Sequence, residues 1–103
     1  MRFYKRIYLS HSIKNKHKII WKLKHGMGMI DIYVISLSKG SDQLDCTHCS
    51  YLKQRILRKN LGTVVGLAKG REELEILLMQ MFEDCLNATG TANIKEYLSG
   101  RIA

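Results

Sequence analysis

Short runs of β-branched and aromatic residues alternate along this chain with segments of helical periodicity. Three apolar runs predict strands, at residues 3–9, 30–37 and 62–68, because each is short and bounded by polar or glycine-containing segments. Helical patterns follow each run. The predicted fold is a small single α/β domain over residues 1–103. It has a three-stranded, mainly parallel sheet, the element order β-α-β-α-β-α-α, and helices packed on the sheet.

A repeated pattern supports this order. Residues 34–45 resemble residues 64–75 at a constant offset of thirty, and each copy has an apolar run, a Lys-Gly turn and an acidic segment before a helical pattern. A continuous apolar run followed by a helix is typical of a strand buried in a parallel sheet. The spacing matches one strand with its crossover helix. We therefore predict two similar βα units, at 31–60 and 61–90.

The helices differ in the strength of their apolar stripes. The stripe of the second unit is continuous and contains Leu74, Leu77, Leu78, Met81, Phe82 and Cys85. Gly90 is expected to end this helix in a left-handed conformation. The first unit has a weaker stripe, formed by Leu44, His48, Leu52 and Ile56. Residues 91–103 predict a last short helix that begins near Asn93.

The segment after the first strand allows two interpretations. In the first, Ser10 or Ser12 caps a helix that ends at Gly26, as hydroxyl side chains commonly do. In the second, residues 19–23 alternate as a strand and turn back into the next strand as a hairpin. We favour the helix, because a strand-helix-strand beginning gives three successive βα units.

Positive charge is concentrated at the start of the chain. The first thirty residues contain eight basic residues and no Asp or Glu, whereas nine basic and nine acidic residues balance from Asp31 onward. This basic strand-helix segment, residues 1–30, therefore accounts for the formal net charge of +8. Such an uneven distribution is typical of a surface that binds a polyanion.

The main functional hypothesis is a non-enzymatic binding or regulatory module that contacts nucleic-acid phosphates. The candidate polyanion-binding residues are Lys14, Lys16, Lys18, Lys22 and Lys24. Lysine is a point charge, whereas arginine is the usual residue for bidentate base recognition, so the contacts are expected to be mostly with phosphate. Three interleaved aromatic residues could stack on bases, namely Tyr4, Tyr8 and Trp21. The alternatives are an anionic membrane surface, an acidic protein, or a solvated lysine-rich face.

A small enzyme or nucleotide-binding protein is the second functional hypothesis. It uses the two strand-end turns, Lys39-Gly40 and Lys69-Gly70, as phosphate turns, because backbone N–H groups at a helix N-terminus bind anions. Each turn has a single glycine, and acidic residues follow it in both copies. These carboxylates would repel phosphate, so this hypothesis ranks second.

Cysteine chemistry is not indicated. Cys46 and Cys49 are spaced as CxxC, but Cys46 falls about a turn inside the predicted helix, where the helix dipole does not activate a thiol. A zinc site needs a second ligand pair, and the chain offers no closely spaced one. We therefore predict no catalytic residue, no metal and no cofactor.

Two further expectations concern location and partners. Three cysteines without a disulfide framework, together with the absence of a convincing targeting or membrane-spanning segment, indicate a cytoplasmic protein. A three-stranded sheet leaves two strand edges open, and open edges can pair with another chain. We therefore expect a homodimer, or docking on another protein.

Overall fold

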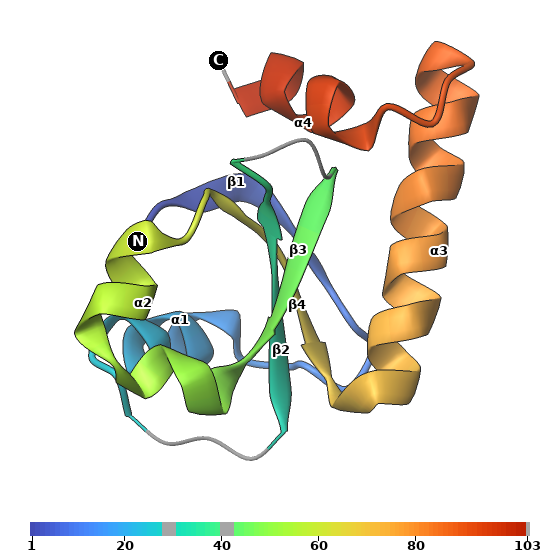
Figure 1. Ribbon diagram of the computed structural model, residues 1–103. Helices are drawn as coiled ribbons and strands as arrows, with labels where there is room; N and C mark the ends of the chain where they lie inside the picture. The colour runs from blue at the N-terminus through green and yellow to red at the C-terminus, as the bar shows by residue number, and fades with distance from the viewer. Residues whose placement is uncertain (28–30, 40–42, 103) are drawn as a thin grey trace.

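Four strands form one mixed sheet in the order β1-β4-β2-β3 (Figure 1). They are β1 (Phe3–Leu9), β2 (Ile32–Leu37), β3 (Leu44–His48) and β4 (Val64–Lys69). This computed structural model describes residues 1–27, 31–39 and 43–102, with side chains as far as residue 98. β1 is parallel to β4, whereas β2 is antiparallel to both of its neighbours, β4 and β3.

β4 is the most deeply buried strand. Four of its residues are completely inaccessible to solvent: Val64, Val65, Leu67 and Ala68. Its sequence is a continuous apolar run because it has neighbours on both edges and helices on both faces. The outer strands are more polar. Lys5 and Arg6 are exposed on β1, and charged residues on an edge strand hinder pairing with another chain.

Helices cover the two faces of the sheet separately (Figure 1). One face carries α1 (Lys16–Lys24), the 3₁₀ helix η1 (Cys49–Lys53) and α2 (Arg55–Asn60). The other carries α3 (Gly70–Thr89) and α4 (Ile94–Ile102). Each face has its own core, centred on Leu23, Leu52 and Leu67 under α1 and η1, and on Ile35, Met81 and Leu98 under α3 and α4. None of the helices in the described ranges is long and apolar enough to cross a membrane.

The prediction of a three-stranded, mainly parallel sheet is wrong. The missing strand is β3, which pairs with β2 as an antiparallel hairpin and occupies residues that were expected to begin a helix. The spacing from Leu44 to His48 explains the error, because four residues fit both one helical turn and two strand repeats. The helix predicted for this unit is reduced to η1 and the six-residue α2. The element order is therefore β-α-β-β-α-β-α-α, with η1 between β3 and α2.

The two similar segments are not equivalent units. Their strands, β2 and β4, are antiparallel neighbours, and Val34 lies opposite Leu67. The first strand leads into a hairpin and the second into α3. The resemblance therefore reflects what two central strands share, which is a buried β-branched run.

Other local predictions are confirmed, with one change of cap. The N-terminal segment forms helix α1, capped by Asn15, whose Oδ1 accepts a hydrogen bond from Lys18 N at 3.2 Å. Ser10 and Ser12 are therefore not its caps. Gly90 ends α3 in a left-handed conformation, with φ of 74°. Asn93 begins α4 by accepting a hydrogen bond from Glu96 N at 3.3 Å.

Ser10 and Ser12 instead join the end of β1 to α3. Ser10 Oγ accepts a hydrogen bond from Lys69 N at 3.0 Å, while Ser12 N and Oγ donate to the Glu73 carboxylate at 3.2 and 2.5 Å. Glu73 has only 17% of its side chain exposed. Hydrogen bonds from Ser10 and Ser12 hold the pKa of Glu73 below its usual range. The folded state therefore favours the ionised carboxylate.

We expect the Glu73→Gln substitution to lower the free energy of unfolding at neutral pH. Because the folded-state pKa is lowered, the stabilisation is present above the usual glutamate pKa of about 4.3 and disappears as the pH falls through the lower value. The difference between wild type and variant should therefore shrink in acid. Urea unfolding followed by far-UV circular dichroism at several pH values measures this. Glu75→Gln is the control, because Glu75 is exposed and forms a surface ion pair with Arg71 at 3.7 Å. Equal pH dependence of the two variants would contradict the prediction.

Candidate polyanion-binding surface

The five predicted lysines do not share one environment. Lys14, Lys18 and Lys24 are exposed, whereas Lys16 and Lys22 are half-buried. Leu23 is completely covered and packs toward the sheet. The helix therefore presents part of the predicted set to solvent and turns the rest toward its flanks.

Two adjoining hollows lie beside the end of α1, at the end of the sheet where β1 and β4 begin. Their volumes are about 400 and 410 Å³. Both are lined by Met1, Arg58 and Lys59. The first also contains Arg2, Lys39 and the segment 61–63, and the second contains Lys24 and Arg55. Six basic side chains from α1, α2, the chain start and the end of β2 therefore converge here.

Main-chain contacts form the first hollow. Val64 N donates to Arg2 O at 2.8 Å, and Leu37 N donates to Thr63 O at 2.9 Å. Between these bonds, Gly62 passes so close to the Leu37 carbonyl that a Cβ atom at Gly62 would collide with the oxygen. Glycine is required at this position because the backbones are in direct contact.

Arg58 is held at the boundary between the two hollows. Its Nη1 donates to Leu52 O and to Lys53 O, both at 2.9 Å, and so binds carbonyl groups at the end of η1. Gly26 has a φ of +65°, and a Cβ there would overlap Arg58 Nη1. Arg58 thus connects α2, η1 and the turn after α1. Because these bonds fix its guanidinium, little ordering is needed before it binds an anion.

We call the six converging residues the basic surface: Arg2, Lys24, Lys39, Arg55, Arg58 and Lys59. The three ion pairs found in the described part of the chain are His11–Glu73, His48–Asp31 and Arg71–Glu75, so none involves the basic surface. In the same part of the chain, no Asp or Glu lines either hollow. Lys24 has an aromatic contact, with its Nζ 5.6 Å from the centre of the Phe3 ring.

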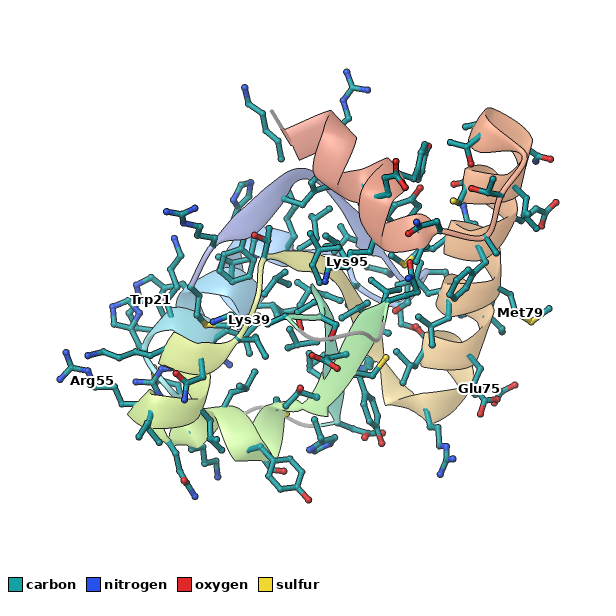
Figure 2. The ribbon with its side chains drawn as sticks, turned by 45° about the horizontal axis from the view of Figure 1, so that its top comes forward. Trp21, Lys39, Arg55, Glu75, Met79 and Lys95 are labelled. Atoms are coloured by element: carbon teal, nitrogen blue, oxygen red, sulfur yellow. The ribbon has the colours of Figure 1, made fainter. Side chains whose placement is uncertain are left out.

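The helices on the two faces of the sheet carry opposite charge. α1, η1 and α2 together contain eight basic residues and no acidic one, whereas α3 contains one basic and five acidic residues. Figure 2 shows Trp21 and Arg55 on one side of the molecule and Glu75 and Met79 on the other. The helices on one face of the sheet are therefore basic, and α3 on the other face is predominantly acidic.

Sequence reasoning found Lys24 and Lys39 but missed the other four residues. Arg55, Arg58 and Lys59 lie in the second half of the chain's first predicted βα unit, where basic residues are expected near a helix C-terminus without any ligand. The sequence does indicate a second basic region, because residues 46–71 contain six basic residues and no acidic one. This second acid-free segment faces the first only in the folded chain, since α2 and the end of α1 line the same hollow.

The two predicted phosphate turns are separated in the fold. Because β2 and β4 are antiparallel, Lys39 and Lys69 lie at opposite ends of the sheet and cannot share a pocket. Lys39 belongs to the basic surface, and Gly40 lies outside the described residues. At the other end, Gly70 N already donates to Asp31 O at 2.8 Å. The Asp31 carboxylate also lies against Gly70 and disfavours an anion there.

The fold brings together a Ser-His-Asp arrangement that the sequence did not reveal. His48 Nε2 is 3.2 Å from Asp31 Oδ1, and His48 Nδ1 is 2.9 Å from Ser50 Oγ. Ser50 N also donates to His48 Nδ1 at 3.2 Å, so His48 caps η1 through this atom. None of the three lines the hollows described above. The cap of η1 accounts for the contacts between His48 and Ser50.

The structure places the two cysteines of the CxxC pattern in different elements from the expected helix. Cys46 lies in β3 and is exposed, whereas Cys49 lies in η1 and is buried, so the expectation that Cys46 lies within a helix is wrong. Although the residue is exposed as a whole, desolvation of its thiol and then the Asp45 carboxylate raise the pKa of Cys46. A raised pKa reduces the reactive thiolate at neutral pH. Among the residues the structure describes, no group of three or more His, Cys, Asp or Glu could hold a metal ion.

Comparison of the chain with protein-family models, curated proteins and solved structures gave no match. A functional assignment therefore depends on the residues and geometry of this protein. The basic surface is the feature on which most of those observations converge.

Gly26→Ala should destabilise the protein more than Gly90→Ala. Both glycines have positive φ, and a side chain in this conformation costs roughly 1–2 kcal/mol. Gly90 has open space around it, whereas a Cβ at Gly26 displaces Arg58. We expect about 1 kcal/mol of further destabilisation from the disturbed hydrogen bonds.

Urea unfolding of the two glycine variants measures this difference. The same pair is then compared in an Arg58→Gln background, where the extra effect of Gly26→Ala should be lost. An extra effect that persists without Arg58 would show that the guanidinium contact is not its cause.

Proposed function

We propose that this protein binds the phosphate backbone of a nucleic acid through the basic surface. The observation that carries the proposal is the convergence of six cations on two adjoining hollows without a carboxylate partner in the described residues. Like charges held close together repel each other, and an anion between them relieves that repulsion. Arg58 supports the proposal most directly, because it is fixed in position and borders both hollows.

The extent of the positive charge favours a polymer over a single small anion. Each hollow has room for phosphate oxygens, and the two share Arg58 and Lys59. Beyond them, Lys14 and Lys18 are exposed toward the beginning of α1. A track of cations along a surface fits successive phosphates of one strand, whereas a small ligand would use one enclosed pocket.

A solvated lysine-rich face is the simplest alternative. Basic residues that serve only to keep a surface solvated can point in any direction. These six residues instead come from four separate segments and border the same two hollows. Three of them are arginines, whose planar guanidinium binds phosphate oxygens in pairs. These two features favour a binding surface.

The affinity for nucleic acid should fall steeply with salt concentration. If about four cations contact phosphate, log–log plots of affinity against salt should have a slope of about −4 on duplex DNA and about −3 on a single strand. The triple variant Lys24→Gln, Arg55→Gln, Lys59→Gln should make this slope less negative, by the amount that about three phosphate contacts contribute. Fluorescence anisotropy with labelled oligonucleotides provides the measurement.

The matched control removes the same number of charges elsewhere. Lys69→Gln, Arg71→Gln and Lys95→Gln change residues of β4, α3 and α4 that line neither hollow. The slope for this variant should differ from the wild-type slope by no more than about one phosphate contact contributes. Absence of binding at about 50 mM salt, or equal losses in the two triple variants, would contradict the proposal.

A further inference from the structure

We infer that the nucleic acid is single-stranded and that one of its bases stacks on Trp21. This inference rests on the proposed function and specifies the ligand of the same surface. Trp21 is the only tryptophan of the chain, and 53% of it is exposed. The core on this face is formed instead by residues such as Leu23, Leu52 and Leu67. The indole is therefore available for another partner.

The Trp21 ring is held in a defined orientation. It stacks on the imidazole of His25 with 4.4 Å between ring centres and 28° between ring planes. The His25 ring is in turn fixed, because its Nδ1 donates to the Trp21 carbonyl at 2.7 Å. Stacking and hydrogen bonding limit the motion of both rings. A base that stacks on this pair therefore meets a surface that is already ordered.

Trp21 lies between cations of the same helix. Lys18 and Lys24 precede and follow it by three residues, so all three lie on one side of α1. Lys24 lines the second hollow together with Arg55, and Figure 2 shows Trp21 and Arg55 projecting from the same side of the molecule. Because Lys24 lines the second hollow and lies about one helical turn from Trp21, a strand whose phosphates occupy that hollow can extend along α1 to Trp21.

An exposed base is a requirement of this geometry. In a duplex the flat face of each base is covered by its neighbours, and only base edges and the sugar-phosphate backbone are exposed. In a single strand an unstacked base can rest on an aromatic ring, and the energy gained depends little on sequence. Of the other aromatic residues considered for stacking, Tyr4 is buried and Tyr8 donates to Asp84 at 2.9 Å. Trp21 is therefore the residue of that set that remains accessible.

The test compares a single strand that carries bases with one that lacks them. One probe is an oligothymidylate of about twelve nucleotides, a length within the range of single-strand sites. The other has the same phosphates but abasic sugars. Wild type should bind the thymidylate about tenfold more tightly than the abasic strand. Its tryptophan fluorescence should be quenched by the thymidylate alone.

Substitution of Trp21 separates stacking from phosphate binding. Trp21→Leu should weaken thymidylate binding about tenfold and leave abasic binding unchanged, while Trp21→Phe should keep part of the preference. Met79→Ala is the control, because Met79 is 72% exposed on α3, on the opposite side of the molecule. It should bind both probes as wild type does.

The outcomes distinguish this inference from the proposed function. Equal, salt-dependent binding of thymidylate, abasic strand and duplex would overturn the stacking inference and leave phosphate binding intact. Absence of binding to all three would overturn both. Vesicles of phosphatidylcholine with phosphatidylserine provide the membrane comparison. A blue shift of Trp21 emission on these vesicles, without quenching by thymidylate, would assign the surface to anionic lipid and overturn the inference.

Discussion

β4 lies between β1 and β2, and the position of every other element depends on this arrangement. The strand is buried along both faces and pairs on both edges, in parallel with β1 and antiparallel to β2. Strands β1 and β2 are therefore kept apart, although they are successive in the sequence. Where β4 begins, Arg2, Lys39 and α2 are brought beside one another. Where it ends, the chain enters α3 on the opposite face.

This topology also separates the charges. Basic helices cover one face of the sheet and an acidic helix covers the other, with a buried layer between them. At that separation the acidic side chains of α3 give only a screened compensation for the cations. The basic surface therefore keeps a positive potential despite the presence of nine acidic residues in the chain. A field of this kind attracts polyanions and orients the molecule as they approach.

The sequence pattern was sufficient to predict those elements whose apolar residues recur with a spacing that fits only a strand or only a helix. The continuous apolar run of β4, the stripe of α3 and the stop at Gly90 could all be predicted, because each depends on neighbouring residues. β3 could not, since the spacing of Leu44 and His48 fits a helix and a strand equally well. The basic surface could be predicted only in part. Lys24 and Arg58 are distant in sequence, and only tertiary packing places them beside the same hollow.

Arg58 connects the stability of the fold to the proposed binding. Its Nη1 is engaged by two carbonyl groups, and a guanidinium has further N–H groups that can reach an anion. Gly26 makes room for this side chain, and Gly62 allows the close backbone approach that shapes the hollow beside it. Two glycines and six neighbouring cations both lower the stability of the folded chain, the glycines through their greater flexibility in the unfolded state and the cations through mutual repulsion. A solvated surface would require neither, because exposed lysines can be spaced apart on ordinary backbone. The proposed polyanion would offset that repulsion with its own negative charge.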